Sequence, residues 1–552
     1  MLKFIAIMKK QISLLLLSLF IFTACEKQLL RKDEILQKRD ALESATPSLL
    51  LSSVIQKSTF VYQAEGGASN KMLATAVQFM QGNRNSDDNI YKNFSKPNSE
   101  LYNLTAQIKL VQAAINDVHK KGLKNYEGIF VVFKTLLWST ATDLYGDMYY
   151  SEGLRGQDGI LFPKFDEQKD IYPALIQDLK DATQLLTDGT EEIDQTYDIM
   201  YGGDKSKWIK LSNSLRLRLL MRSVKSLPNG ASEIAAVAAL PLITANSENA
   251  AIEYKTGDVT YSWPMGSSNM PFQQNYLIMR PSKTLVDTLK ILNDSRLHVW
   301  VAPLEKPWTN NPSNNGVEVN TTDPNGFSYT STWEYIDRSN PLLNNVAYAI
   351  QDSLTLYAGY EVGMYAEVLY ANGSYDFPDT KWNYKVSTFS KLLNQNAHPL
   401  IKATVIQADE VHFLLAEAAV KGYVSGVDAE ALYKRGVELA MNRWGQSLPG
   451  GYFNNAAAKF PASGTNEEKL AKIGLQKWLG LFMMGVEAYS DLRRTGIPAI
   501  QHNGKLANGL NAFPLRLRYP ESESANNAQN YSSAVSKLDK GDNEYSKMWL
   551  IK

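Results

Sequence analysis

Tryptophan and asparagine residues occur together in the middle of this chain, within segments rich in proline and glycine. Flat indole rings can stack on the C–H faces of sugar rings, and side-chain amides can hydrogen-bond to hydroxyl groups. The residues predicted to contact a ligand there are Trp263, Trp308, Trp333, Trp382, Asn269 and Asn383. An earlier loop adds Asn83, Arg84 and Tyr91. These residue types favour passive binding of a neutral oligosaccharide, and they suit a peptide as well.

Residues that could carry out catalysis show no recognisable arrangement. No phosphate-binding Gly-x-x-x-x-Gly-Lys loop is present, and Gly266 to Ser268 do not form a nucleophile elbow. The carboxylates of Glu361 and Glu367 leave glycoside hydrolysis as a minor alternative, because the sequence does not give their separation. Metal-ligand spacing is absent from the histidines, which are His119, His298, His398, His412 and His502. The sequence therefore predicts a binding protein that is not an enzyme and needs no metal or cofactor.

The composition excludes one large class of partner. Lysine and arginine together number 57, and so do aspartate and glutamate, which gives a formal net charge of zero. A nucleic-acid-binding protein depends on a basic surface that neutralises phosphates, so no nucleic acid partner is expected. The 552 residues exceed the size at which one core usually stops growing, and we expect at least two packed sub-regions in one large body.

The N-terminus carries the pattern of a lipoprotein signal. Lys9 and Lys10 precede an apolar run over residues 12–22, and small residues lead to Cys25, the single cysteine of the chain. The segment resembles a bacterial lipobox, so residues 1–24 are predicted to be a signal peptide and Cys25 to be lipidated. Residues 25–45 then form a charged tether, and Met8 is an alternative start to Met1. A plain secretory signal with an incidental cysteine is the alternative.

Helices are predicted on both sides of the tryptophan-rich region. Apolar residues at 3.6-residue spacing indicate a mainly α fold of antiparallel helical hairpins, and the fold class is tetratricopeptide-like although the strict 34-residue signature is absent. An ordinary helical core explains the same pattern. The capping box from Thr465 to Glu468 predicts a further helix start. The remaining predicted helices cover residues 47–58, 104–118, 126–144, 170–186, 207–224, 409–421 and 428–441.

These elements give a predicted domain organisation. Residues 46–552 form a single body, in which 46–253 and 405–500 are helical scaffold. Residues 254–404 are a large irregular region with short strands that faces the ligand, and 501–552 are loop-rich. The tryptophans on helical stripes are predicted to lie in the core and are Trp138, Trp208, Trp444 and Trp478.

Two motifs resemble a known family. Residues 142–152 read Thr-Asp-Leu-Tyr-Gly-Asp-Met-Tyr-Tyr-Ser-Glu, and residues 487–498 read Glu-Ala-Tyr-Ser-Asp-Leu-Arg-Arg-Thr-Gly-Ile-Pro. Both are similar to motifs of the SusD/RagB family of outer-membrane nutrient-binding lipoproteins, with Tyr149 in place of the usual proline and Tyr489 in place of tryptophan. The motif residues are predicted to be structural, serving turns, caps and ion pairs, and are Asp143, Gly146, Asp147, Asp491, Arg493, Arg494 and Gly496.

The resemblance implies a location and a partner. A SusD-like protein would lie at the cell surface, lipid-anchored in the outer membrane, over a SusC-like TonB-dependent transporter that docks on its helical side. It would bind an oligomeric nutrient, most plausibly a glycan, and hand it to that transporter. Two alternatives stay open: a peptide or amino-acid nutrient, and a transporter lid with little affinity of its own.

Overall fold

The computed structural model describes residues 46–66, 71–82, 87–97, 100–257, 261–266, 279–337, 339, 354–363, 386–500 and 512–551. The predicted signal peptide, Cys25 and the tether lie outside these described residues, as do Asn83, Arg84, Asn269, Trp382 and Asn383. No helix within the described ranges is both long enough and apolar enough to cross a membrane.

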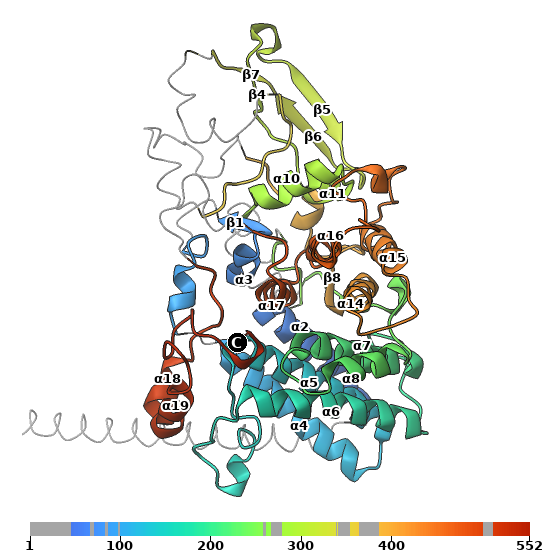
Figure 1. The fold of residues 1–552 in the computed structure, drawn as a ribbon, viewed down its shortest axis with the longest axis vertical. Coiled ribbons are helices and arrows are strands. Elements are labelled where there is room, and N and C mark those ends of the chain that lie inside the picture. Colours follow the sequence, from blue (N-terminus) through green and yellow to red (C-terminus); the bar gives the residue numbers. More distant parts are fainter. Residues whose placement is uncertain are drawn as a thin grey trace, which may run out of the picture.

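The N-terminal part of the scaffold is a stack of antiparallel helices, seen in the lower half of Figure 1. Asp204 begins one of them by accepting hydrogen bonds from the backbone amides of Ser206 and Lys207, at 3.0 and 3.4 Å. The predicted hairpins of residues 104–144 and 170–224 are confirmed, and the first helix is longer than predicted. The helices are α2 (Pro47–Gly66), α3 (Lys71–Ala76), α4 (Glu100–Lys120), α5 (Lys124–Tyr145), α6 (Gln168–Asp188), α7 (Lys205–Ser223) and α8 (Gly230–Ala238).

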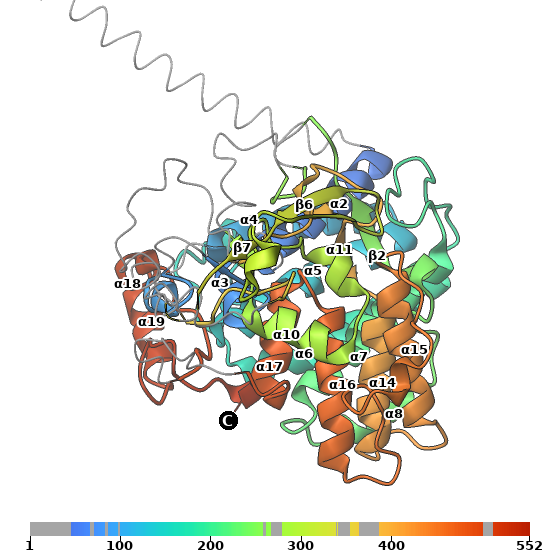
Figure 2. The same cartoon turned by 90° about the horizontal axis from the view of Figure 1, so that it is seen from above.

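The C-terminal part of the scaffold is a second helical group, α14 (Ala408–Val420), α15 (Ala429–Asn442), α16 (Asn466–Gly480) and α17 (Gly485–Thr495). Asp428 caps α15, and the predicted capping box opens α16, with Thr465 and Glu468 bonding each other's backbone amides. The α14–α15 hairpin is tight, because a Cβ atom added at Gly436 would lie 2.7 Å from the Phe413 ring. Figure 2 shows α14, α15 and α16 side by side.

The region predicted to be irregular contains short two-stranded sheets, as expected. Strands β1 and β3 pair antiparallel, as do β5 and β6 and also β2 and β8, whereas β4 and β7 are parallel. The β5–β6 hairpin forms the upper end of the molecule in Figure 1. The strands are β1 (Met80–Gly82), β2 (Ala250–Glu253), β3 (Met279–Pro281), β4 (Trp308–Thr309), β5 (Glu318–Thr322), β6 (Ser328–Thr332), β7 (Glu334–Tyr335) and β8 (Lys402–Ile406).

Several short helices were not predicted. In the central region α10 (Lys283–Leu292) and α11 (Arg296–Trp300) interrupt the irregular structure, and near the C-terminus α18 (Glu521–Asn526) and α19 (Ala528–Val535) occur in the segment predicted to be loop-rich. The hydroxyl of Ser282 caps α10 by accepting from the amide of Leu285 at 3.0 Å. The 3-10 turns are η1 (Lys92–Ser95), η2 (Gly156–Asp158), η3 (Asn246–Glu248), η4 (Pro312–Asn314), η6 (Lys391–Asn394), η7 (Tyr452–Asn454) and η8 (Trp549–Ile551).

One continuous apolar core joins the two helical groups. The predicted core tryptophans are confirmed, since Trp138, Trp208, Trp444 and Trp478 are all buried. Within this core, buried charged side chains from different helices form ion pairs. The guanidinium of Arg218 donates to both carboxylate oxygens of Glu410 at 2.7 Å, and it lies 3.3 Å from Glu487. These contacts tie α7 to α14 and α17.

The first family motif makes its contacts inside the protein. Asp143 accepts hydrogen bonds from the Tyr172 hydroxyl and from Arg222. Gly146 ends α5 with φ 91°, a conformation that favours glycine. The carboxylate of Asp147 accepts from the amide of Gln168 at 2.9 Å, at the first residue of α6.

The residues of the second family motif also make their contacts inside the protein, at the end of α17. Asp491 accepts from Lys477 at 2.8 Å and from Arg494 at 2.6 Å, and Arg494 also donates to both oxygens of Glu417 at 2.5 and 2.6 Å. Arg493 instead donates to the Leu515 carbonyl at 2.7 Å and lies over the Tyr489 ring. Gly496 ends the helix with φ 68°.

Candidate binding site

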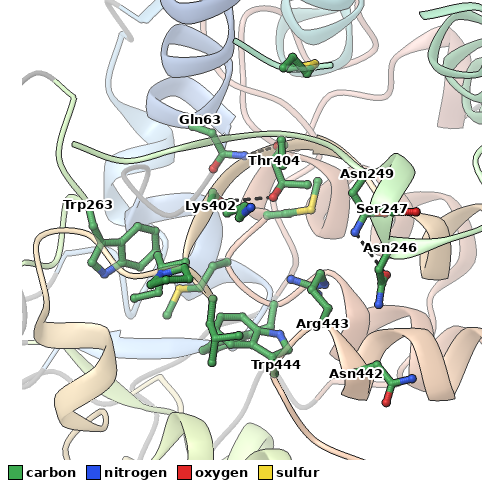
Figure 3. Close-up of a pocket in the computed structure, with 18 residues that line it drawn as sticks. Gln63, Asn246, Ser247, Asn249, Trp263, Lys402, Thr404, Asn442, Arg443 and Trp444 are labelled. Carbon is green, nitrogen blue, oxygen red and sulfur yellow. Dashed lines mark hydrogen bonds between the residues drawn. The ribbon is translucent and has the colours of Figure 1, made fainter. Parts of the chain in front are cut away.

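A pocket of about 390 Å³ opens where the scaffold meets the central region. Its volume is near the lower end of the ~300–1,000 Å³ range of small-molecule sites. Figure 3 shows its side chains converging from α2, β2, β8, α15 and the link between α16 and α17. It is lined by Gln63, Met200, Asn246, Ser247, Asn249, Ala251, Trp263, Pro399, Leu400, Ile401, Lys402, Thr404, Asn442, Arg443, Trp444, Phe482, Met483 and Met484.

The β2–β8 pair holds one wall of the pocket. Its antiparallel register places Ala251 opposite Thr404 and Glu253 opposite Lys402. The amide of Gln63 on α2 donates to the Thr404 carbonyl, which fixes the strand against the helix. The Gln63 amide oxygen accepts no hydrogen bond from the described residues and is drawn on the pocket side in Figure 3. A hydroxyl donor on a ligand would satisfy it.

Two asparagines are fixed at the next part of the wall. Asn246 donates to the Leu439 carbonyl at 3.0 Å and accepts from Asn249 at 3.3 Å. The Asn249 amide oxygen in turn accepts from the backbone amide of Ala408 at 2.7 Å. Each amide group therefore has a set orientation, which is the preorganisation that a binding site for hydroxyl groups requires.

Two indole rings form the apolar part. Trp263 donates from its indole nitrogen to the Leu393 carbonyl at 2.9 Å and packs edge-on against Tyr254. Trp444 packs edge-on against Trp300, with 5.5 Å between ring centroids. Close to them, Met483 has φ 67°, an uncommon conformation for a residue with a side chain. Such local strain occurs preferentially at functional sites.

The charges at the pocket are of one sign. Its 18 described lining residues include two cations, Lys402 and Arg443, and no carboxylate. Arg443 donates to the Gly480 carbonyl at 2.7 Å, and its Nε lies 3.9 Å from Asp409, which is buried behind it. Burial raises the pKa of Asp409 to about 6, because the nearby guanidinium only partly offsets the loss of solvation.

A second hollow has different chemistry. It is an open groove at the junction of α5 and α6, of about 980 Å³. Its wall includes the carboxylates of Asp188, Glu191, Glu192 and Asp194 and, among the described lining residues, no tryptophan. The pocket at Arg443 is the better candidate, because it combines two indole rings with several fixed amides, whereas the described lining of the groove has one tyrosine ring, Tyr126, and is rich in carboxylates.

The structure brings one of the predicted ligand contacts, Trp263, into the pocket. Trp308 is buried in β4 next to β7, and Trp333, half-buried, exchanges backbone hydrogen bonds with Gly316 and Val317. Tyr91 is 3% exposed and packs edge-on against Phe94 and Phe513. Ligand contact by these other residues stays a prediction.

Sequence reasoning missed most of the pocket. Gln63, Asn246, Asn249, Lys402, Asn442 and Arg443 come from segments far apart in the chain. The hydrogen bond from Gln63 to Thr404 spans 341 residues, and the one from Ala408 to Asn249 spans 159. No local pattern marks such residues, although the closely spaced Asn246 and Asn249 are a signal that could have been used.

The described residues provide little support for metal-dependent catalysis or for glycoside hydrolysis by a carboxylate pair. Among the described residues, no group of three or more His, Cys, Asp or Glu side chains is placed to hold a metal ion. Glu361 is 7% exposed, and Glu367 lies outside the described residues, so the structure gives no separation for this carboxylate pair.

The structure is that of a mainly helical protein with a pocket between its scaffold and its central region, and comparison with known proteins gives the family. Residues 39–520 match the SusD-like family, described as starch-binding and associating with the outer membrane. The chain belongs to this family. None of the curated proteins matches it.

Solved structures share the fold. A SusD homolog from Bacteroides fragilis NCTC 9343 is 21% identical, with a TM-score of 0.69 over 92% of this chain and 100% of that chain. A chitin-binding SusD homolog from Flavobacterium johnsoniae is 20% identical, with a TM-score of 0.67 over 93% of this chain and 99% of that one. A further chitin-binding protein is 23% identical, with a TM-score of 0.68 over 92% of this chain and 100% of its own.

Proposed function

We propose that this protein binds an oligomeric glycan at the cell surface and passes it to a SusC-like TonB-dependent transporter, without catalysis of its own. The observation that carries the proposal is the pocket at Trp263, Trp444 and Arg443, in which two indole rings line the cavity beside fixed amides. Membership of a family described as starch-binding, and a shared fold with chitin-binding proteins, support a glycan over a peptide.

The anchor and the partner belong to the same proposal. Residues 1–24 are removed, Cys25 carries lipid, and residues 25–45 tether the body to the outer membrane. Mass spectrometry of the N-terminal peptide tests the acylation of Cys25. Affinity purification from detergent-solubilised outer membranes tests the partner, and recovery of no TonB-dependent transporter would count against it.

Calorimetry with purified protein tests the binding itself. Neutral and acidic oligosaccharides are compared with peptides of similar length. A glycan ligand is expected to bind and the peptides not, whereas tight peptide binding alone would support the alternative nutrient. A transporter lid would bind neither.

Two matched variants locate the ligand. Trp263→Leu removes an indole at the pocket, and Trp308→Leu removes an equally buried indole outside its lining. Loss of one aromatic contact is expected to weaken glycan affinity about 3- to 10-fold for Trp263→Leu and to leave Trp308→Leu unchanged. Melting temperatures show that both variants are folded. The reverse result would move the binding surface to the β4–β7 region.

A further inference from the structure

The guanidinium of Arg443 has unused hydrogen-bonding capacity at the pocket. Its Nη2 donates to the Gly480 carbonyl, its Nε makes no hydrogen bond although it is buried, and its Nη1 makes none with the described residues. The side chain is 15% exposed, and Figure 3 places it between Trp444 and the segment of Asn246 and Asn249. Because Nε is enclosed, the end of the planar guanidinium that carries Nη1 and Nη2 is the part that can meet a carboxylate, in two-point contact.

Three other buried arginines are paired more closely with carboxylates, whereas Arg493 donates to a backbone carbonyl and a hydroxyl. Arg218, Arg296 and Arg494 each contact a carboxylate oxygen at 2.7 Å or less. The carboxylate nearest Arg443 is that of Asp409, at 3.9 Å, and its Oδ1 accepts no hydrogen bond. The positive charge of Arg443 is therefore incompletely compensated within the protein.

The second cation at the pocket, Lys402, is also incompletely paired. Lys402 is exposed at the rim and is 3.6 Å from Glu253, whose side chain is 74% exposed, so its charge is only weakly paired. The carboxylates that oppose the two cations, Asp409 and Glu253, are not among the described lining residues, so the groups that face the cavity are cationic or neutral and suit an anion. The indoles and the fixed amides lie within the same space.

We propose that the pocket binds an acidic sugar, a hexuronate unit of an oligosaccharide, with its carboxylate on Arg443. This inference rests on the proposed function and names the chemical class of its ligand. The ring of the sugar lies against the indoles, its hydroxyls meet Asn246, Asn249 and Gln63, and Lys402 adds long-range attraction. It replaces the neutral glycan that the sequence predicts.

Calorimetry with the full chain at low ionic strength tests the proposal. The probes are oligouronides of galacturonate, glucuronate and mannuronate, each with the neutral oligosaccharide obtained by reducing its carboxyl groups. At least one oligouronide is expected to bind about 10- to 100-fold more tightly than its neutral counterpart, as a charge-assisted contact predicts. Added salt weakens that binding.

Variants assign the effect to Arg443. Arg443→Gln is expected to remove the preference for the acidic probe. The double variant Arg443→Gln, Asp409→Asn removes the buried charge left behind and is expected to give the same binding in a folded protein. Arg435→Gln is the matched control, because Arg435 lies on α15, which ends just before Arg443, and its side chain is 46% exposed and paired with Glu438.

The outcomes separate the two proposals. Equal affinity for acidic and neutral probes would overturn the acidic-sugar inference and leave glycan binding intact. Binding of peptides that have a free terminal carboxylate, with no sugar bound, would overturn both. Absence of binding to every sugar and peptide would also overturn both proposals. It would leave the alternative of a transporter lid with little affinity of its own.

Discussion

In the helical scaffold the guanidinium of Arg218 is enclosed by two carboxylates, whereas at the pocket Arg443 faces one carboxylate across 3.9 Å. The first arrangement pairs the charge of Arg218 at 2.7 and 3.3 Å within the core, away from the pocket, although its Nη1 has no hydrogen-bond partner. The second leaves donors and a charge partly unsatisfied beside a cavity. The two arrangements differ in how far the protein itself pairs a buried charge, and we propose that the closely paired one joins helices while the loosely paired one serves recognition.

The scaffold pair gives the largest expected effect. Arg218→Met leaves Glu410, which is 1% exposed, without its bidentate partner, and should lower the free energy of unfolding by about 3–5 kcal/mol. Arg435→Met on α15 is the control, because its side chain is 46% exposed and that of its partner Glu438 is 42% exposed, and it should cost less than about 1 kcal/mol. Urea unfolding measures both. Equal losses would show that the buried pair has no special role in stability.

The loose pair at the pocket predicts a pH dependence of the opposite sign to that of one scaffold carboxylate, Glu417. With a pKa of about 6 when folded, against 3.8 for the ordinary group, Asp409 contributes stability that is present below pH ~4 and is lost as pH rises through 6, amounting to about 3 kcal/mol. Glu417 behaves in the reverse way. Although burial raises its pKa, Arg494 lowers it to about 2, so its contribution is lost as pH falls from ~4.5 towards 2.

The variant Asp409→Asn tests the predicted pH dependence of stability directly. The stability of the variant relative to wild type should rise by about 3 kcal/mol between pH 4 and 7, since the titrating group is gone. Chemical unfolding at a series of pH values measures it, with Glu438→Gln, an exposed site on α15, as the control. A constant difference across that range would mean that Asp409 ionises normally and is well paired.

The rim of the pocket gives the smallest expected change. Lys402 and Asn442 are exposed, and Asn442 makes no side-chain hydrogen bond with the described residues. Lys402→Gln and Asn442→Ala should each change the free energy of unfolding by less than about 0.5 kcal/mol. Thermal unfolding is sufficient to check this. A loss of unfolding free energy comparable with that of Arg218→Met would show that these rim residues stabilise the fold. The pocket and the scaffold would then not differ in this respect.

The two regions also differ in how far the sequence predicts them. Scaffold helices begin at local signals, such as the caps at Asp428 and Thr465, and both were predicted because a cap acts within three residues. The short helix α10 has a similar cap at Ser282, but its ten residues lie among proline-rich and aromatic segments where the helical period was not evident.

The pocket depends on contacts between distant segments, which local patterns do not encode. Trp263 was predicted from its type and its surroundings, and it lines the pocket. Trp444 was assigned to the core, which is correct, yet it also forms part of the wall. Arg443 was not predicted to bind ligand. Its loose pairing with Asp409 on α14, at 3.9 Å, arises from tertiary packing that no local pattern encodes.

The pairing of β2 with β8 has a consequence for the integrity of the chain. The two strands join the end of the first helical group to the start of the second, and the bonds from Arg218 to Glu410 and from Ala408 to Asn249 bridge the same junction. A single proteolytic cut between them would yield two fragments that stay bound through a shared interior. They would migrate as one particle under native conditions and separate only in denaturant.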